Sequence, residues 1–357
     1  MREKEVVIVV NPGSTSTKFA LFNRDGVVVE ETVRHAPEAF EAFDLVSEQF
    51  PIRFEMISKA VSKAVADNGL TIVGSVGRGG PVKPLAGGTY RISQPLLDDL
   101  KSCKFANHAS NLGGMIAAEF ASTYNLSDSY IVDPVTTDNM WDKARLSGLP
   151  GIERACRVHA LNIKAVARHI AKEKNISFES SRFIVAHMGG GISIAALDGG
   201  KIVDVNDGLL GMGPFSPERA GALPLRGLMK LCYSTDESEL KKKLSKESGL
   251  KAYLGTNDFR EVVKMIDGGD TNAQKVVDAF VYQVAKEIGA YATAFQGKVD
   301  GVIVTGGIAH QERFTGALKK YVSWIADYHI FPGENELQAL AEGAFRVIDN
   351  EETPQEY

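Results

Sequence analysis

The apolar and polar positions of this chain form one pattern that occurs twice. In the first copy, strands are predicted at Glu5–Val10, Phe19–Phe22 and Val27–Val29, because each is a mainly apolar run bounded by turn residues. A turn rich in Gly, Ser and Thr, Asn11–Lys18, joins the first two strands, and the polar turn Asn23–Gly26 joins the next two. The chain is therefore expected to open with two successive hairpins.

The second copy of the pattern begins about half a chain later. Its strands are predicted at Phe183–Ala186, Ile194–Leu197 and Ile202–Val205, with the turns His187–Gly191 and Asp198–Lys201 between them. The repeat predicts two similar halves that face each other, each offering a loop rich in backbone groups to one ligand.

Elsewhere the pattern alternates helices with strands. Helices are predicted at Ala36–Gly69, Ser110–Tyr124, Ala160–Lys174 and Asn272–Gln296, after Gly307 and from about Glu334 to Asp349, and strands at Thr71–Val76, Ser129–Val132 and Val299–Val304. The segment Asp207–Pro224 is rich in Gly and Pro and is expected to be irregular. This alternation indicates an α/β architecture, and the hairpins make its sheets mixed.

Composition narrows the class of protein. The 357 residues are 44% hydrophobic and 24% charged, which is typical of a soluble globular protein with room for two domains. The formal net charge is −5 and no basic stripe is visible, so no nucleic-acid partner is expected. Three widely spaced cysteines, Cys103, Cys156 and Cys232, fit reduced thiols in a cytoplasm. No apolar stretch approaches the ~20 residues of a membrane span, and Val6–Val10 is too short for a signal peptide.

The turn Asn11–Lys18 is a candidate phosphate site. Glycine lets backbone N–H groups approach phosphate oxygens, the Ser14 and Ser16 hydroxyls can donate to them, and Lys18 supplies positive charge. The alternative is a plain tight turn, since Asn-Pro-Gly is common in turns. The recurrence of the pattern in the second half favours the phosphate interpretation.

The turn His187–Gly191 is a second candidate anion site. Its three glycines leave a loop almost without side chains, which suits contact with an anion. A single histidine at a strand end is more often a core residue, but here His187 would point toward the anion. The segment Thr305–Gly307 fits either strand-to-helix packing or an adenine ring lying against the backbone.

The common nucleotide-binding motifs are absent from the sequence. It contains no Gly-x-x-x-x-Gly-Lys-Ser/Thr run, no clean Gly-x-Gly-x-x-Gly after a strand and no protein-kinase catalytic loop. Five polar residues lie beside Gly, Pro or predicted element ends: Arg78, His108, Asp133, His159 and Arg219. Each alone is more typical of a solvated surface, and the set has meaning only if the fold brings it together.

Five motifs, in this order, resemble the acetate kinase family, and within it the butyrate and branched-chain fatty acid kinases. They are Asn11–Lys18, Asn107–Asn111, His187–Gly191, Gly213–Gly221 and Thr305–Ile308, and the resemblance extends over essentially the whole chain. It implies the α/β fold of actin, sugar kinases and heat-shock ATPases. Two duplicated ribonuclease-H-like domains would each contain a mixed five-stranded sheet flanked by helices, with a cleft between them. The implied domains are 1–170, on which the helix 334–349 packs back, and 171–333, on the nucleotide-binding side.

The resemblance also implies roles for residues near the transferred group. Arg78 would hold the substrate carboxylate, His108 would line the acid pocket, and Asp133 would lie near the transferred phosphoryl group and the metal. His187 would contact the phosphoryl group in transfer, and Arg219 matches a second active-site arginine.

Nucleotide and metal ligands follow from the same resemblance. The residues implied in ATP or ADP binding are Asn11, Ser14, Ser16, Lys18, Gly189, Gly190, Gly191, Gly306 and Gly307. Magnesium would be held by Asp133 and Glu336, with Glu334 as the alternative to Glu336.

Two departures from the acetate-specific enzymes are visible. Their Phe-His-Gly-Thr-Ser-His segment appears here as Val158–Asn162, so the resemblance assigns no catalytic role to His159. The glycine-rich stretch before Arg219 is also rearranged. These departures, together with the shorter chain, indicate the butyrate branch.

The implied reaction is the reversible transfer of the γ-phosphoryl group of ATP to a short-chain carboxylate such as butyrate, giving ADP and an acyl phosphate. A carboxylate with a pKa of about 4.3 is already ionised near neutral pH, so no general base is needed. Catalysis must instead position two anions and neutralise their charge with Mg²⁺ and arginines. A homodimer or a larger homo-oligomer in the cytoplasm is expected from the family.

Two alternatives stay open at this point. One is an acetate or propionate kinase of the same family, because the substrates differ by only one or two methylene groups. The other belongs to a different class: an actin-like or chaperone-like ATPase in which nucleotide hydrolysis drives assembly or clamping.

Overall fold

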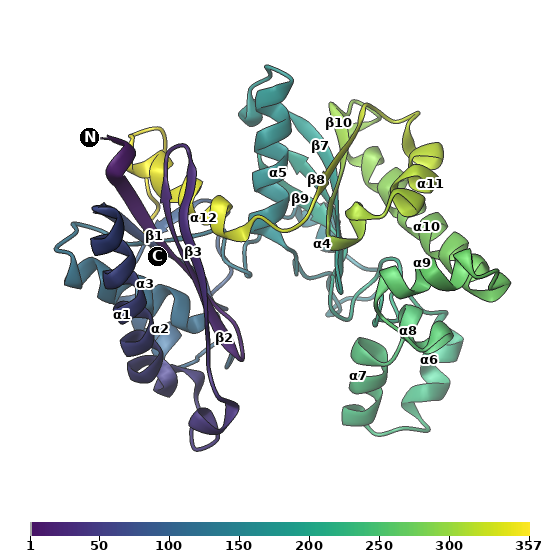
Figure 1. The fold of residues 1–357 in the computed structure, drawn as a ribbon. Helices are drawn as coiled ribbons and strands as arrows, with labels where there is room; N and C mark the ends of the chain where they lie inside the picture. Colours follow the sequence, from purple (N-terminus) through teal and green to yellow (C-terminus); the bar gives the residue numbers. More distant parts are fainter. Residues whose placement is uncertain (1) are drawn as a thin grey trace. The chain divides into compact units, whose positions relative to one another are not determined.

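The computed structural model describes residues 2–357, and its internal contacts divide the chain into two compact units (Figure 1). Unit 1 comprises the chain up to Asp138 together with Asn335–Tyr357, and unit 2 is Asn139–Glu334. The boundary therefore lies earlier than residue 170, where the sequence suggested it. Residues 139–170 belong to unit 2 because their apolar side chains, such as Met140 and Ile163, pack against the strands of that unit.

Unit 1 is built on a six-stranded mixed sheet with the strand order β3-β2-β1-β4-β6-β5. Its strands are β1 (Glu5–Pro12), β2 (Ser16–Asn23), β3 (Gly26–Arg34), β4 (Thr71–Arg78), β5 (Thr89–Arg91) and β6 (Tyr130–Val132), and its helices are α1 (Phe50–Asn68), α2 (Gln94–Lys101), α3 (Asn111–Thr123) and α12 (Glu336–Ile348). β1 pairs antiparallel with β2 and parallel with β4, so the two predicted N-terminal hairpins form one side of the sheet.

Helices cover both faces of this sheet. α1 and α3 pack against Val6, Ile8 and Val10 of β1 and form the main core of the unit. Side chains alternate between the faces of a strand, and Val7 accordingly points to the other side. There, Ile348 of α12 approaches Gly74.

Unit 2 contains a five-stranded mixed sheet with the order β11-β10-β7-β8-β9. Its strands are β7 (Arg182–Met188), β8 (Ile192–Asp198), β9 (Lys201–Val205), β10 (Gly301–Gly306) and β11 (Tyr328–Pro332), and its helices are α4 (Asp142–Arg145), α5 (Ala160–Glu173), α6 (Leu225–Cys232), α7 (Glu237–Lys246), α8 (Gly249–Leu254), α9 (Phe259–Asp267), α10 (Thr271–Ala292) and α11 (Glu312–Val322). β7 pairs antiparallel with β8 and parallel with β10, as β1 does with β2 and β4. The repeat seen in the sequence is thus a repeat of sheet topology.

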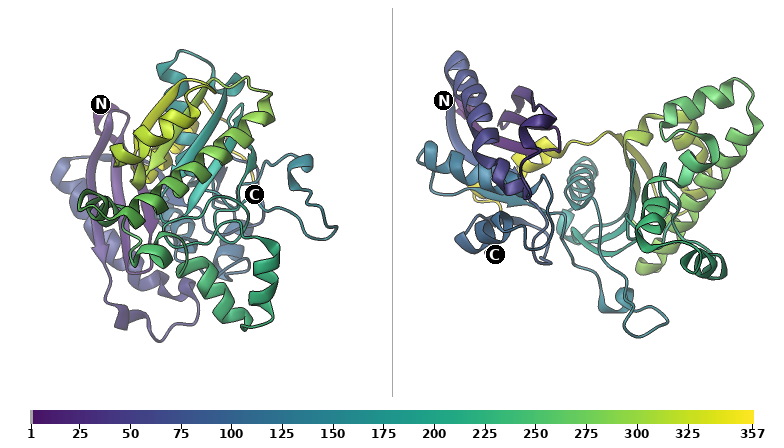
Figure 2. Two further views of the ribbon diagram at one scale, coloured as in Figure 1. Left: turned by 90° about the vertical axis from the view of Figure 1, so that its right-hand side faces the viewer. Right: turned by 90° about the horizontal axis from the view of Figure 1, so that it is seen from below.

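The sheet of unit 2 lies between two layers of helices (Figure 2). α5 packs against one face, where Val185 and Ala195 point toward it. α10 and α11 cover the other face, toward which Ile184 and Ile194 point. Both faces of β7 and β8 are therefore buried.

The predicted α/β architecture, with two mixed sheets flanked by helices, is confirmed. The first sheet has six strands and not five, because Thr89–Arg91 adds an antiparallel edge strand to β6. The helix predicted over Ala36–Gly69 is wrong in its first part: α1 begins at Phe50, with Pro51 in its first turn, where the missing N–H costs nothing. No helix in the described part of the chain is long and apolar enough to cross a membrane.

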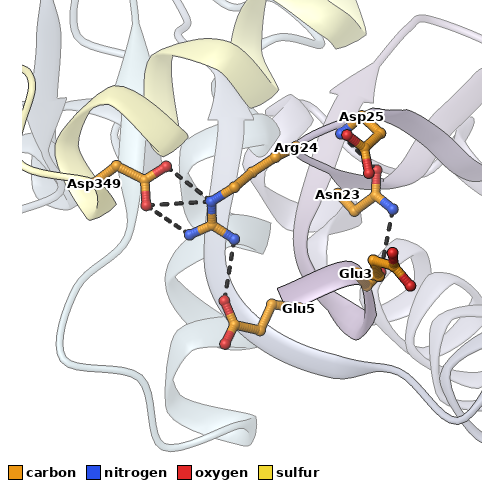
Figure 3. A network of polar contacts seen from close by, with 6 residues as sticks. All are labelled: Glu3, Glu5, Asn23, Arg24, Asp25 and Asp349. Atoms are coloured by element: carbon orange, nitrogen blue, oxygen red, sulfur yellow. Dashed lines mark hydrogen bonds and ion pairs between the residues drawn. The ribbon is translucent and has the colours of Figure 1, made fainter. Parts of the chain in front are cut away.

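Arg24 links the N-terminal hairpin to the end of α12 through hydrogen bonds and ion pairs (Figure 3). Its guanidinium donates to the Asp349 carboxylate through Nη2 at 2.6 Å and Nε at 2.9 Å, and Nη1 donates to Glu5 at 3.1 Å. The guanidinium carbon also lies 4.8 Å from the centre of the Phe345 ring on α12. These contacts hold in place the helix whose first residue is Glu336.

We expect the substitution Arg24→Met to lower the free energy of unfolding by about 1–3 kcal/mol, because two partly buried carboxylates lose their shared cation. Arg260→Met is the matched control, since Arg260 also pairs with a carboxylate, that of Asp258, but its side chain is 76% exposed. Urea unfolding of both variants measures the difference. An equal loss of stability in the two variants would contradict the role given to Arg24.

Candidate active site

The turn between β1 and β2 presents hydroxyl and amine groups at the end of a hairpin. Asn11 faces Lys18 in the register of the two strands, and the Gly13 amide donates to the Ser16 carbonyl at 2.7 Å. Ser14 and Lys18 are exposed, whereas Asn11 and Ser16 are half-buried. The nucleotide-binding residues expected in unit 1 therefore lie together on one short turn.

A buried arginine that the sequence pattern did not single out lies behind this turn. Arg53, on α1, is 0% exposed. Its Nη1 donates to the Gly13 carbonyl at 2.7 Å and to the Thr17 hydroxyl at 3.2 Å, and its Nη2 donates to the Ser14 carbonyl at 3.0 Å. An arginine in a helix is usually solvated, so no signal in the sequence distinguished this one.

His35 packs beside Arg53 under the same turn. Its Nε2 lies 2.9 Å from the Thr17 hydroxyl, and its ring meets Phe40 edge to face. Burial, together with the nearby charge of Arg53, lowers the pKa of His35 to about 4. The imidazole is therefore neutral near pH 7.

Arg78, Glu336 and Asn11 contact one another directly. Arg78 is the last residue of β4, and its Nη1 forms an ion pair with Oε1 of Glu336, the first residue of α12. The other carboxylate oxygen, Oε2, accepts a hydrogen bond from Asn11 Nδ2 at 2.8 Å. Three residues predicted for the carboxylate, the metal and the phosphate are thus brought together within unit 1.

His108 lies near the Arg78 charge because α3 begins close to the end of β4. Gly77 and Gly113 allow this approach, since a Cβ on either one would collide with the backbone of the other element. His108 Nδ1 accepts from the Ser110 amide at 3.2 Å and lies 2.7 Å from the Ser110 hydroxyl, so the ring proton is on Nε2. Loss of hydration and the charge of Arg78 both lower the pKa of His108.

Asp133 follows β6 in a strained backbone conformation. Its φ of 40° is in the left-handed region, which costs a non-glycine residue roughly 1 kcal/mol or more and is frequent at functional sites. The side chain is 5% exposed, and its Oδ1 accepts from the Gly88 amide at 2.8 Å. Within residues 2–357, no three His, Cys, Asp or Glu side chains are gathered as a metal site.

In unit 2, His187 is buried inside the end of β7 and not in the turn that follows. His187 is 1% exposed, and its Nδ1 lies 2.9 Å from the side-chain nitrogen Nδ2 of Asn162 on α5. Because an amide nitrogen only donates, Nδ1 accepts and Nε2 carries the proton. This Nε2 lies 3.2 Å from Oε1 of Glu334. Glu334 is thus beside His187 in unit 2, whereas Glu336 is beside Arg78 in unit 1.

His159, one of the five polar residues singled out in the sequence, lies against His187, although the family resemblance assigned it no role. The two rings are stacked with their centres 4.1 Å apart and an angle of 14° between their planes. His159 Nδ1 lies 2.9 Å from the hydroxyl of Ser193, which faces His187 across β7 and β8. The fold therefore places a second imidazole beside the predicted one.

Arg219 lies against the glycine turn between β7 and β8. A Cβ on Gly191 would collide with its guanidinium, so only glycine permits this contact. Arg219 Nη1 donates to the Gly208 carbonyl, and its amide donates to Ser216 Oγ at 3.1 Å. Ser216 Oγ in turn donates to the Gly190 carbonyl at 2.8 Å. The turn and the arginine thus form one connected group.

The segment Thr305–Gly307 ends β10 beside the same strand. Gly306 exchanges two backbone hydrogen bonds of 3.1 Å with Gly333, and Thr305 faces His187 in the register of β10 and β7. Gly307 begins a short 3₁₀ turn, and nothing lies within 4 Å of the place where its Cβ would stand. Backbone at this position is open to a ligand.

Residues 151–320 match the model of the Acetokinase family. The matched segment contains His159, His187 and Arg219, and it covers a little under half of the chain. The part of the chain that carries the glycine turn and its arginine is therefore the part that matches a family of known kinases.

Solved structures of similar fold extend the comparison to the whole chain. Acetate kinase from Porphyromonas gingivalis has a TM-score of 0.77 at 18% identity, with 96% of this chain and 100% of that chain covered. A propionate kinase from Francisella tularensis gives 0.75 at 20% identity over 96% and 99%. Acetate kinase from Entamoeba histolytica gives 0.75 at 17% identity over 95% and 98%. At these identities the likeness shows the fold, and the predicted fold class is confirmed.

We expect the free energy of unfolding to fall as the pH is lowered from about 6.5 to about 4. In the unfolded chain His35 takes up a proton near its ordinary pKa of 6.5, whereas the folded state keeps the ring neutral down to a pKa of about 4. Protons therefore favour unfolding across this range. His35→Gln, which can still bond Thr17, should reduce the slope by up to about 1.4 kcal/mol per pH unit. Unfolding curves with the same slope in both proteins would contradict a neutral buried His35.

Proposed function

We propose that this protein is a kinase of short-chain carboxylates, which transfers the γ-phosphoryl group of ATP to the carboxylate and forms ADP and an acyl phosphate, reversibly. The observation that carries the proposal is the match of residues 151–320 to the Acetokinase family, because that segment holds the glycine turn with the Arg219 guanidinium against it. The likeness of fold to acetate and propionate kinases supports it.

Arg78 is the group that we assign to the substrate carboxylate. Its guanidinium already forms an ion pair with a carboxylate, that of Glu336, and a guanidinium has five donors with which to hold a second one. The Nε2–H of His108 is a further donor for the acid. Two donors of this kind would fix the nucleophilic oxygen before transfer.

No residue is needed to remove a proton, because the acid is ionised near neutral pH. Asn162 fixes the His187 ring so that it presents the Nε2–H, which suits donation to a phosphoryl oxygen. Arg219 would neutralise charge on the same group. In unit 1, Ser14, Ser16 and Lys18 would donate to phosphate oxygens of the nucleotide.

We assign magnesium to the carboxylates of Asp133 and Glu336. Mg²⁺ is usually held by one or two carboxylates together with phosphate oxygens and water, so a cluster of three acidic ligands is not required. When bound, the ion supplies positive charge to the phosphate oxygens. Glu334 is the alternative ligand, and its carboxylate lies near His187 Nε2.

A mixture with ATP, butyrate and hydroxylamine tests the proposed activity. Formation of the acyl hydroxamate, dependent on both ATP and the acid, is the expected result. Hydrolysis of ATP at the same rate with and without the acid would contradict it and would favour an actin-like or chaperone-like ATPase.

We further propose that butyrate or a branched short-chain acid is preferred over acetate. The proposal rests on the replacement of the acetate-specific segment by Val158–Asn162. One methylene group in an apolar pocket contributes about 1–3 kcal/mol, so kcat/KM for butyrate or isobutyrate should exceed that for acetate by about tenfold or more. A series with acetate, propionate, butyrate and isobutyrate decides this, and a maximum at acetate or propionate would contradict it.

We expect Arg219→Ala to lower kcat by about 10²–10³-fold while the KM for the acid changes little, because a donor to the phosphoryl group in transfer is lost. Arg226→Ala, at an exposed position on α6, is the control and should leave kcat unchanged. Steady-state kinetics of both variants provide the comparison. Unchanged turnover in Arg219→Ala would remove this residue from the mechanism.

A further inference from the structure

Arg53 is a buried cation without a counter-ion among the described residues. Its hydrogen-bond acceptors are the Gly13 and Ser14 carbonyls, the Thr17 hydroxyl and the side-chain oxygen of Gln49, with a longer contact to the Ser16 carbonyl. The guanidinium carbon also lies 4.8 Å from the centre of the Phe40 ring. No carboxylate within residues 2–357 forms an ion pair with it, although buried charges are normally paired.

The guanidinium of Arg53 stays positively charged in its buried position. Burial lowers the pKa of its guanidinium only to about 10, so it stays protonated near neutral pH. Burial and the charge of Arg53 together lower the pKa of the neighbouring His35 to about 4, so that this imidazole is neutral. The guanidinium of Arg53 therefore places a positive charge, unpaired among residues 2–357, against the inner side of the turn Asn11–Lys18.

Arg53 also orients the backbone of the turn. In a trans peptide the C=O and the following N–H point in opposite directions. Because the Gly13 and Ser14 carbonyls point inward to Arg53, the amides of Ser14 and Thr15 point away from it, toward the exposed side of the turn. Within the described residues neither amide donates to a protein acceptor. Adjacent free amides of this kind form an anion-binding concavity.

We propose that Arg53 is a positioning residue for phosphate: it turns the Ser14 and Thr15 amides outward and supplies from beneath the positive charge that a bound phosphate group neutralises. The proposal rests on the proposed function, because the phosphate belongs to the ATP of that reaction. The phosphate is the missing counter-ion of Arg53, held across the turn and not by direct contact.

The first experiment measures affinity as a function of ligand charge. Arg53→Met should weaken ATP binding by about 10–100-fold, because the positive charge beneath the turn and the outward orientation of the Ser14 and Thr15 amides are both lost, and it should leave adenosine binding within about twofold. Arg53→Lys keeps the charge and should retain most of the affinity for ATP. Arg91→Met, which removes another arginine of unit 1, one that pairs with Asp128 and Glu356 away from the turn, is the control and should bind both ligands like the wild type.

The outcomes separate the two proposals. A wild type that binds no ATP contradicts the proposed function. Three other results contradict only the role given to Arg53. In the first, Arg53→Met binds ATP as well as the wild type does. In the second, Arg53→Met loses affinity for adenosine and ATP equally, and in the third, Arg53→Lys loses as much affinity for ATP as Arg53→Met.

A second experiment needs no substitution and decides the matter if Arg53→Met does not fold. The pKa of His35 is followed by NMR in the wild type, with and without inorganic tripolyphosphate. We expect the pKa to rise from about 4 when the anion binds, since its negative charge offsets that of Arg53. An unchanged His35 pKa at saturating tripolyphosphate would overturn the proposal.

Discussion

Arg53 and Arg219 donate to carbonyl oxygens of the main chain, and no carboxylate within residues 2–357 forms an ion pair with either guanidinium. Arg53 donates to the carbonyls of Gly13 and Ser14, and Arg219 donates to that of Gly208. A carbonyl dipole fixes the direction of a guanidinium without neutralising it, whereas a carboxylate would do both. Both arginines lie against the turn of a repeated hairpin, and the proposed reaction between two anions would need cations in this state.

The two repeated hairpins share a topology but hold different chemistry. In unit 1 the turn carries hydroxyls and a lysine, and its charge lies beneath it in Arg53. In unit 2 the turn is bare backbone, and the charge lies against it in Arg219, with two stacked imidazoles at the end of β7. The two units thus share a similar backbone arrangement of strands and turn. The chemical difference between the two turns comes from the side chains around them.

Much of the fold follows from local pattern. The hairpins, the long helix α10 and the buried strand β10 were predicted near their observed bounds, because apolar periodicity and turn residues act over a few positions. The domain boundary and the start of α1 were not, because burial of residues 139–170 in unit 2 depends on partners distant in the chain. The contact between His159 and His187 could not be predicted from local pattern either, since the two residues lie on different elements.

The sequence by itself determined the repeat, the α/β class and the two turns, because glycine, proline and short polar residues impose their conformations locally. Only the tertiary structure decided which charged groups stand behind those turns. Arg53 is an ordinary residue of an amphipathic helix until α1 packs on the sheet and brings it under Gly13. The ion pair of Arg78 with Glu336 likewise forms only when α12 returns to unit 1. Such contacts depend on through-space distances, which no local pattern of residues encodes.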